Sequence, residues 1–323
     1  MNLIKKNLKH QNSLRLSSEA ELFFEYENLD ELKKLNSYCR KNNLRICALG
    51  EGTNTIFPRN FKDVVAKSKN KKFKVDKNTV KIGAGVNWNE AVFKTIKNGC
   101  FGLENLAGIP GSVGAAPIQN IGAYGVEISD LIDYVECFDT KLKITRKIRN
   151  ENCDFAYRKS VFQEGTDLIV TAIGLKLQKE FNPVLNHESI QDTTYRKASD
   201  MIDGIRAIRN TKIPNPLDFP NLGSFFKNPI MAKVECNSNH KLKDLKHYEM
   251  PNEMIKFSAG EMLDRLSLKG MKIRNVGLST KHALVLTSTG IAAAKDIKYV
   301  EDILRNMVLE HYGVELEREP IYL

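Results

Sequence analysis

The sequence lacks a long hydrophobic run. No apolar stretch approaches the roughly 18 to 20 residues that cross a bilayer, and Lys and His interrupt the apolar residues of the first fourteen positions. We therefore expect neither a membrane protein nor a secretory signal, and we place the protein in the cytoplasm. The six cysteines include no CxxC pair, and no HExxH or other metal-ligand cluster occurs. We expect buried free thiols and no metal site.

The composition that is present is ordinary for a globular protein, with 42% hydrophobic and 27% charged residues among 323. At roughly 150 residues per domain, this length predicts two or three domains. The net charge of +10 is concentrated in residues 59–81, where nine Lys and Arg face two Asp. Short apolar runs between these lysines predict a small meander. We favour a solvated sheet edge protected by lysine; a docking surface for phosphates is the alternative.

Hydrophobic periodicity predicts both helices and strands. A helix is expected at 28–43 with Asp30 as its cap, followed by a buried strand at 44–49 that leads into a glycine loop. A second helix is expected at 87–98, ended by Gly99. Further strands are predicted at 131–138, 142–148, 168–177 and 314–322, and further helices between Thr193 and Pro214 and at 292–312.

Residues 99–125 hold seven of the 20 glycines and a single charge, Glu104. Such an apolar stretch with little side-chain bulk is unsuited to a long surface loop. It suits a backbone that presses against a flat or phosphorylated ligand, because glycine permits close approach and positive φ angles. Packing of small residues is the alternative.

The two glycine-rich loops suggest a dinucleotide held by backbone amides. Neither loop is the GxGxxG of a Rossmann unit, since the segment from Gly108 to Gly114 has the wrong spacing and contains a proline. A Rossmann nicotinamide domain is therefore disfavoured, and an organic cofactor bound by another architecture is expected.

Five segments occur here in a characteristic order. They are GEGTN at 50–54, GLENLAGIPGSVGAAPIQNIGAYGVE at 102–127, FAYRKS at 155–160, GSFFKNP at 223–229 and LEREP at 316–320. Together they resemble the UDP-N-acetylenolpyruvoylglucosamine reductases over nearly the whole chain. GEGTN alone is weak, whereas the segment at 102–127 combined with GSFFKNP is highly specific.

The resemblance implies an α+β fold, with a two-subdomain FAD-binding module of the vanillyl-alcohol-oxidase type and a C-terminal α+β substrate domain. The expected boundaries are 1–65 and 66–212 for the two FAD subdomains and 213–323 for the substrate domain, whose last strand can pack back on the FAD module. The resemblance also implies NADPH-dependent, FAD-mediated reduction of a UDP-sugar enolpyruvyl ether to UDP-N-acetylmuramate, for peptidoglycan.

Three residues match the catalytic positions of the family. Arg158 matches the arginine that holds the substrate carboxylate, for which a guanidinium fork is well suited. Ser224 matches the serine that acts as general acid toward the developing carbanion, and Glu319 matches a carboxylate that works in the same step. Glu317 would share a strand face with Glu319, so confusing these two glutamates is the main risk.

The resemblance also assigns cofactor and substrate contacts. The cofactor residues are Gly50, Glu51, Gly52, Thr53, Asn54, Gly111, Ser112, Gly114, Ala115, Gln119, Asn120, Gly122, Ala123 and Arg209. The substrate residues, besides Arg158, are Tyr124, His187, Lys212, Asn228 and His282. His187 stands where one class of the family carries a tyrosine on an extra loop. An imidazole is smaller and titrates nearer neutrality, which puts that clamp role in doubt. A histidine without a substrate role is an equal alternative for His282.

We expect a monomer whose partners are the UDP-sugar and NADPH, with neither nucleic acid nor membrane. Two rival functions remain at this point. A flavoprotein oxidase of the same wider class would turn over without NADPH. A nucleic-acid or nucleotide binding module using the 59–81 lysines would be colourless and sensitive to salt.

Overall fold

The computed structural model describes residues 2–163 and 165–323. The chain forms two compact units, each assembled from separate segments. Unit 1 comprises residues 1–6, 20–51 and 62–209, and unit 2 comprises residues 7–19, 52–61 and 210–323. In the described part of the chain, no helix is both long enough and apolar enough to span a membrane.

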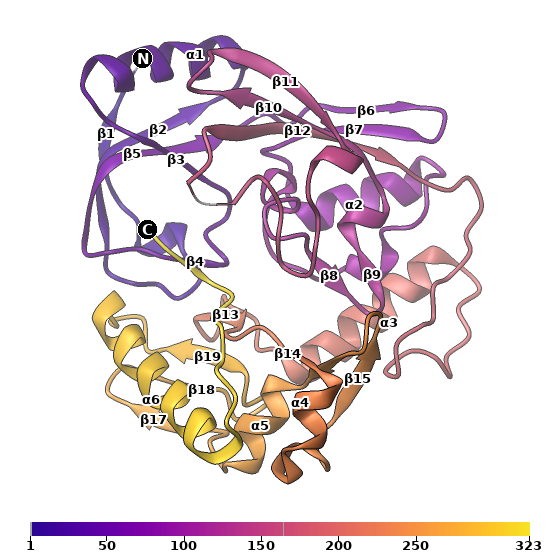
Figure 1. The fold of residues 1–323 in the computed structure, drawn as a ribbon. Coiled ribbons are helices and arrows are strands. Elements are labelled where there is room, and N and C mark those ends of the chain that lie inside the picture. Colours follow the sequence, from indigo (N-terminus) through magenta and orange to yellow (C-terminus); the bar gives the residue numbers. More distant parts are fainter. Residues whose placement is uncertain (1, 164) are drawn as a thin grey trace. The chain divides into compact units, whose positions relative to one another are not determined.

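The first layer of unit 1 is a sheet in the order β1-β2-β5-β3 with helix α1 (Leu29–Lys41) against it (Figure 1). Leu32, Leu35 and Cys39 of the helix pack against Val64 and Ala66 of the sheet. Strands β3 and β5 run parallel, with Ile46 opposite Val64. The strand bounds are β1 (Ile4–Asn7), β2 (Glu19–Tyr26), β3 (Ile46–Leu49) and β5 (Asn60–Ser68).

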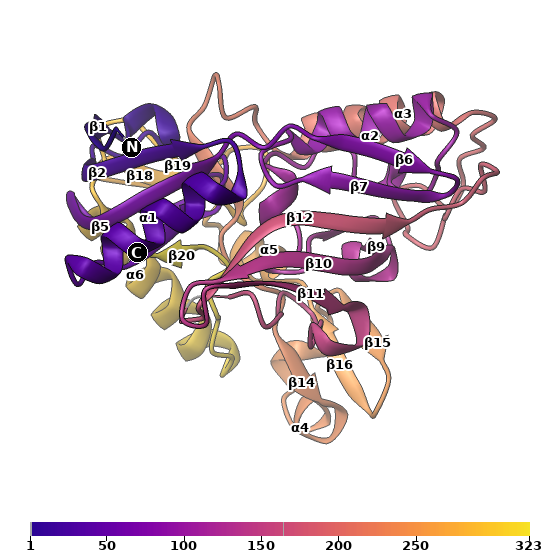
Figure 2. The same cartoon turned by 90° about the horizontal axis from the view of Figure 1, so that it is seen from above.

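The second sheet of unit 1 is antiparallel, in the order β11-β10-β12-β7-β6. Helices α2 (Trp88–Lys97) and α3 (Ala198–Lys212) share one hydrophobic core with it, in which Trp88, Ile82 and Ile202 are fully buried (Figure 2). The strands are β6 (Phe73–Asp76), β7 (Thr79–Gly83), β10 (Ile132–Asp139), β11 (Ile144–Arg149) and β12 (Leu168–Lys176). A short hairpin is made by β8 (Gly122–Ala123) and β9 (Val126–Glu127).

Unit 2 is built on a sheet in the order β13-β19-β18-β17 and a smaller one in the order β14-β16-β15. The long helix α6 (Ala294–Tyr312) contributes Ile297, Val300 and Leu304 to the core of this unit. The short parallel pair of β4 and β20 also belongs to unit 2. The remaining bounds are β4 (Thr55–Ile56), β13 (Asn221–Ser224), β14 (Ile230–Ala232), α4 (Lys233–Asn237), β15 (His247–Met250), β16 (Met254–Phe257), α5 (Ala259–Arg265), β17 (Lys272–Ile273), β18 (Val276–Leu278), β19 (Val285–Ser288) and β20 (Ile321–Tyr322).

Helices α1, α2 and α6 and strands β3, β10, β11 and β12 begin and end within two residues of their predicted bounds. The prediction of Asp30 as the cap of α1 was wrong. Asn28 is the cap, and its side chain accepts a hydrogen bond from the Glu31 amide at 3.1 Å. This choice follows from geometry, because a capping side chain must precede the first helical turn.

Two strand predictions also need correction. The predicted strand 314–322 is regular only at β20, although Arg318 forms an isolated bridge with Phe226. The predicted meander at 59–81 is divided between sheets: β5 joins the first sheet, whereas the β6–β7 hairpin lies at one edge of the second. Residues 69–72 connect them, so the lysine-rich segment links two sheets.

Candidate active site

The glycine-rich segments approach each other closely within unit 1. A Cβ on Gly50 would lie 2.7 Å from the Ser112 hydroxyl oxygen and 3.3 Å from the Ala115 methyl. A Cβ on Gly114 would lie 2.6 Å from that of Ala84. Both distances are too short for an added Cβ, so the absence of side chains at Gly50 and Gly114 lets these segments pack closely against Ser112 and Ala84. The same reasoning explains the scarcity of bulk that the sequence shows at 99–125.

The segment at 111–115 is fixed by backbone hydrogen bonds. The amides of Val113 and Gly114 donate to the carbonyls of Val86 and Ala84, each at 2.9 Å. The Gly111 carbonyl accepts a hydrogen bond from the Trp88 amide at 2.9 Å, and Ser112 bridges Asn87. The stretch is therefore held against the end of β7 and the start of α2.

The GEGTN loop is divided between the units. In unit 1 the Glu51 carboxylate pairs with Lys67 at 3.2 Å. In unit 2 Gly52 has φ +63°, and a Cβ there would lie 2.0 Å from the Gln11 carbonyl oxygen. The carbonyls of Gly52 and Asn54 accept hydrogen bonds from the amides of Ser13 and Ile321.

Asn120 holds the chain beyond the second glycine segment in place. It is fully buried with φ +42°. Its amide nitrogen donates to Glu127 at 2.7 Å and to the Ala156 carbonyl at 3.2 Å, and its oxygen accepts from the Ser129 amide at 3.0 Å. Gln119 beside it is also buried.

Arg158 extends from a tight turn in which Ala156 and Lys159 exchange backbone hydrogen bonds. Its own φ of +52° is a strained conformation for a residue with a side chain. The guanidinium donates to the Gly122 carbonyl at 3.4 Å and stands 5.2 Å from the Tyr157 ring centroid. Unit 1 thus brings Arg158 to the strand that carries Gly122 and Ala123.

Tyr124, His187 and Arg209 form a second cluster in unit 1. The rings of Tyr124 and His187 pack edge to face with centroids 5.2 Å apart. Burial raises the pKa of the Tyr124 phenol, and its hydrogen bond with the Arg209 cation offsets part of this effect. Burial likewise lowers the pKa of the Arg209 guanidinium.

Asn105 is a positioning residue that the sequence analysis missed. Its buried amide donates to the Tyr124 carbonyl at 2.8 Å and to the Val184 carbonyl at 2.9 Å. It therefore fastens the loop that carries His187 to the segment that carries Tyr124. The available signal was an uncharged polar side chain in a glycine-rich apolar stretch, since a buried amide must find partners.

The backbone that follows Ser224 pairs with the segment that carries Glu319, within unit 2. Ser224 ends β13 after Gly223, which has φ +69°. The next residue, Phe225, accepts a hydrogen bond at its carbonyl from the Glu319 amide at 2.8 Å. The Asn54 side chain donates to the Glu319 carbonyl at 3.4 Å, so the GEGTN loop contacts the same segment.

The structure separates the two candidate glutamates. Glu317 is exposed and pairs with Lys227 at 2.5 Å, and its carbonyl accepts from the Lys227 amide at 2.8 Å. Glu319 is only half buried. Because the Glu317 carboxylate forms an exposed ion pair with Lys227, Glu319 is the better candidate for catalysis.

The other predicted substrate residues of unit 2 lie around α5. The Asn228 side chain accepts from the Ala259 amide at 3.1 Å, at the first turn of that helix. The His282 ring packs where Gly260 leaves room, and its Nδ1 accepts from the Leu284 amide at 3.1 Å. Burial, and then the Lys212 charge, lower the pKa of His282.

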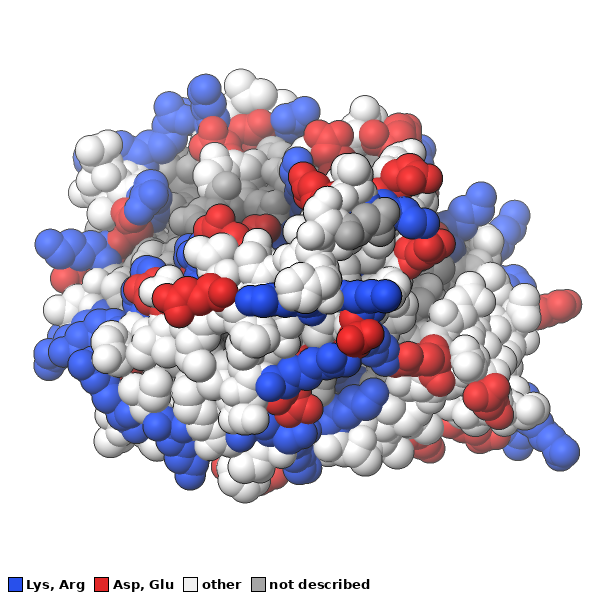
Figure 3. Space-filling view, turned by 60° about the horizontal axis from the view of Figure 1, so that its bottom comes forward, with Lys and Arg blue, Asp and Glu red and all other residues white. Residues whose placement is uncertain are grey.

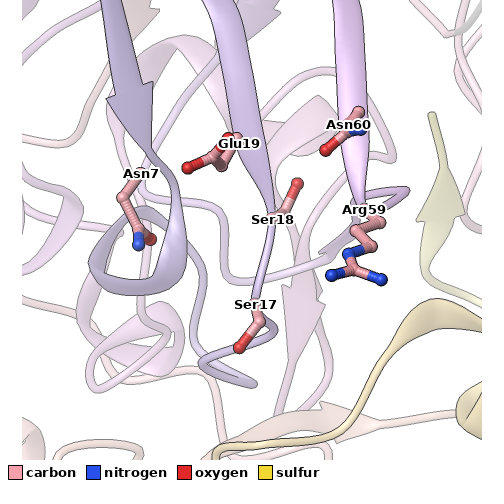
Figure 4. A pocket seen from close by; sticks show the side chains of 6 residues that line it. All are labelled: Asn7, Ser17, Ser18, Glu19, Arg59 and Asn60. Carbon is pink, nitrogen blue, oxygen red and sulfur yellow. The ribbon is translucent and has the colours of Figure 1, made fainter.

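One further hollow is defined among the described residues. A hollow in unit 2 is lined by Asn7, Ser17, Ser18, Glu19, Arg59 and Asn60 (Figure 4), and it contains none of the predicted residues. Its mixed lining specifies no ligand. Figure 3 shows cations and carboxylates interspersed on one face. Within 59–81, Lys67, Lys69 and Lys81 each pair with a glutamate.

Comparison with known proteins decides the family. Residues 215–323 match the C-terminal domain model of UDP-N-acetylenolpyruvoylglucosamine reductase, and residues 20–146 match an FAD binding domain model. The reductase of Pasteurella multocida (strain Pm70) is 35% identical, with 97% of this chain and 95% of the relative covered. That of Aliivibrio fischeri (strain ATCC 700601 / ES114) is also 35% identical, with 98% and 93% covered. The chain belongs to the UDP-N-acetylenolpyruvoylglucosamine reductase family.

The fold agrees with this membership. The crystal structure of UDP-N-acetylenolpyruvylglucosamine reductase from Thermus caldophilus aligns with a TM-score of 0.71 at 24% identity, and the alignment covers 100% of this chain and 99% of that one. The predicted family and the predicted α+β fold with an FAD-binding module are confirmed. The match of residues 20–146 to an FAD binding domain model supports FAD as the cofactor, and the close packing at Gly50 and Gly114 is what the small residues of these segments permit.

The contact between Gly50 and Ser112 can be tested with a rescue pair. We expect Gly50→Ala to lower the free energy of unfolding by about 1 kcal/mol or more, because it overpacks this contact. Adding Ser112→Ala removes the hydroxyl and should recover at least half of that loss, relative to Ser112→Ala alone. Urea denaturation measures all four proteins. Equal losses in both backgrounds would show that the two residues do not meet.

The depressed pKa of His282 predicts a pH dependence of stability. A histidine whose pKa is lower in the folded state binds protons preferentially when unfolded. Its stabilising contribution is therefore present above the ordinary histidine pKa of about 6.5 and is lost as pH falls below it. His282→Gln should lose less stability than the parent between pH 7 and pH 5 in urea titrations. The exposed His240→Gln serves as control; identical acid losses in all three proteins would refute the assignment.

Proposed function

We propose that this protein catalyses the NADPH-dependent, FAD-mediated reduction of UDP-N-acetyl-3-O-(1-carboxyvinyl)glucosamine to UDP-N-acetylmuramate, a step of peptidoglycan precursor synthesis. Membership of the reductase family supports the reaction. The structural observation that supports it most is the 2.8 Å hydrogen bond from the Glu319 amide to the Phe225 carbonyl. This bond joins the Glu319 backbone to Phe225, the residue after Ser224, in the part of the chain that matches the family's C-terminal domain model.

Bound FAD would supply two-electron hydride transfer between NADPH and the enolpyruvyl double bond. The residues proposed to hold FAD include many glycines. They are Gly50, Glu51, Gly52, Thr53 and Asn54 of the first loop, Gly111, Ser112, Gly114 and Ala115 of the second, and Gln119, Asn120, Gly122, Ala123 and Arg209. Among them Asn120 acts by shaping the backbone, because its side chain is committed to Glu127, Ala156 and Ser129.

Arg158 is proposed to bind the carboxylate of the substrate. Reduction of a double bond conjugated to a carboxylate places negative charge on the adjoining carbon and on the carboxylate oxygens. A guanidinium holds two oxygens at once and stabilises this charge more than the charge of the ground state, which is the requirement for catalysis. The fixed turn of Ala156 and Lys159 presents Arg158 with little freedom, so less ordering is needed when substrate arrives.

Ser224 is proposed to donate the proton that completes the reduction. A serine hydroxyl is a weak acid, so it can donate only to a strongly basic carbon and only where the resulting alkoxide is stabilised. Glu319 is proposed to assist at this step, by orienting the hydroxyl and balancing charge. Two observations support these roles: Gly223, with φ +69°, precedes Ser224 at the end of β13, and the Glu319 amide donates to the carbonyl of the next residue, Phe225.

The remaining proposed contacts recognise the UDP-sugar. Tyr124, Lys212 and Asn228 offer a phenol, a cation and an amide for the diphosphate and sugar. His187 is proposed to replace the usual loop tyrosine by packing edge to face against Tyr124. His282, kept neutral by its lowered pKa, would serve as a hydrogen-bonding group rather than as a cation.

We also propose that residues 1–65, 66–212 and 213–323 act as two FAD subdomains and a substrate domain, in a monomeric enzyme of the cytoplasm. All six cysteines are free thiols, which suits a reducing compartment. Burial raises the pKa of the Cys39 and Cys137 thiols to about 11, so these two are unreactive at neutral pH.

Separate measurement of the two half-reactions tests the proposed roles. Ser224→Ala should reduce its flavin with NADPH at a rate within about twofold of the parent. Reoxidation by the UDP-sugar should slow by about 10²- to 10⁴-fold, the range that a positioned acid contributes. Stopped-flow absorbance follows both phases. Ser288→Ala, on the neighbouring strand β19, is the control and should keep both rates. Loss of both half-reactions in equal measure, or of neither, would contradict the role of Ser224.

A further inference from the structure

The segment from Val314 to Glu317 alternates between buried and exposed positions. Val314 and Leu316 are buried in the core of unit 2, whereas Glu315 and Glu317 are exposed. Side chains of an extended chain alternate in this way, so Arg318 continues the inward series and Glu319 the outward one. The group that contacts the Arg318 side chain therefore also fixes the orientation of Glu319.

The partner of Arg318 is Glu301 on α6, whose side chain is 0% exposed. The Arg318 guanidinium donates to the Glu301 carboxylate at 3.3 Å, and that of Arg305 lies 3.9 Å away. Arg305 also pairs with Glu315. A buried carboxylate is tolerated only with such partners, and removing one of them costs several kcal/mol in typical proteins. The buried Glu301 carboxylate therefore depends on these guanidinium groups for its stability.

Tyr322 completes the cluster around the buried Glu301 carboxylate. The Arg318 guanidinium carbon stands 4.7 Å from the centroid of the Tyr322 ring. Burial, and then the Glu301 charge, raise the pKa of the Tyr322 phenol, so it stays neutral. Tyr322 lies in β20, which pairs in parallel with β4. The cluster thus joins α6 to both ends of the stretch 318–322.

A register shift of the segment would be penalised by charge. Moving the chain by one residue would exchange its inward and outward faces, and a glutamate, Glu317 or Glu319, would then face the buried carboxylate of Glu301. Two carboxylates in one buried site repel each other and cannot both ionise. Only the observed register puts a cation there. The hydrogen bonds of Glu317 and Glu319 to the 225–227 backbone are then made in one alignment.

We propose that Glu301 is a positioning residue for the active site: its ion pair with Arg318 sets the register of the C-terminal segment and so places Glu319 beside Ser224. This inference rests on the proposed function, because that function gives Glu319 its role. Within the described residues, the partners of Glu301 are Arg305, Arg318 and Tyr322, which have no assigned substrate or cofactor role. Its effect on Glu319 is transmitted through Arg318.

The decisive variant is Glu301→Gln, which keeps the shape and removes the charge. We expect flavin content and reduction by NADPH to stay within about twofold. The kcat with the UDP-sugar should fall by about 10- to 100-fold, the size expected for a misplaced catalytic group, with KM changed less than about threefold. Combined with Glu319→Gln, it should add less than about threefold, because groups that act through one another are not additive. Hydrogen exchange of the 314–323 amides in the flavin-free protein should also become faster.

The control is Arg274→Gln, which breaks the pair with Asp296 in the first turn of α6 and should alter neither half-reaction. Arg318→Lys is the second variant. Its side chain is 38% exposed, so it should fold even if Glu301→Gln does not, and it should show a smaller kcat loss with the same lack of additivity.

Three results separate the possible failures. If Glu301→Gln and Arg318→Lys behave like Arg274→Gln while Glu319→Gln is slow, the inference is overturned and the proposed function stands. If Glu301→Gln multiplies the defect of Glu319→Gln in full, its role is structural and the inference is also overturned. If Glu319→Gln reoxidises at the parent rate, the proposed role of Glu319 fails, and the inference fails with it.

Discussion

The proposed chemistry of unit 2 depends on the backbone pairing of residues 225–227 with residues 317–319. The two partners are about ninety positions apart in sequence, and neither forms a long regular strand. The pairing is made by two hydrogen bonds of 2.8 Å and the bridge between Phe226 and Arg318. Its alignment therefore needs support from side chains. The buried Glu301 carboxylate supplies it from one side, and the Asn54 amide on the Glu319 carbonyl from the other.

Unit 1 uses a different physical device. Its glycine segments pack closely because Gly50 and Gly114 carry no side chain, and hydrogen bonds with Ala84, Val86 and Trp88 hold the 111–114 backbone in place. Two cationic side chains of this unit lie in fixed positions: Arg158 extends from a strained turn, and Arg209 lies beside the Tyr124 phenol. Rigid backbone suits a large flat cofactor, whereas fixed cations suit carboxylates and phosphates. These two preferences are the ones expected of a flavoenzyme that acts on a sugar nucleotide.

The sequence predicted the elements whose periodicity is strong and local. Helix α6 and strands β10 to β12 are examples, as is the lack of bulk near Gly50 and Gly114. It could not predict Asn28 over Asp30, because both are good caps and only the start of the helix decides. It misjudged 314–322, since two hydrogen bonds to a distant segment hold most of that stretch without a ladder. It could not distinguish Glu317 from Glu319 chemically, because the partner of Glu317 is Lys227, ninety residues earlier. Asn105 and Glu301 were missed for the same reason: burial and partners distant in sequence give them their importance.

The central claim is that this chain binds a flavin and uses it to pass electrons from NADPH to the UDP-sugar. The most direct test is the visible spectrum of the purified protein under anaerobic conditions, followed during sequential addition of the two reactants. The account predicts flavin absorbance that is bleached by one equivalent of NADPH and restored by one equivalent of the enolpyruvyl UDP-sugar. A colourless protein that acquires no absorbance when FAD is added, or a bleached flavin that the sugar nucleotide leaves unchanged, would contradict it.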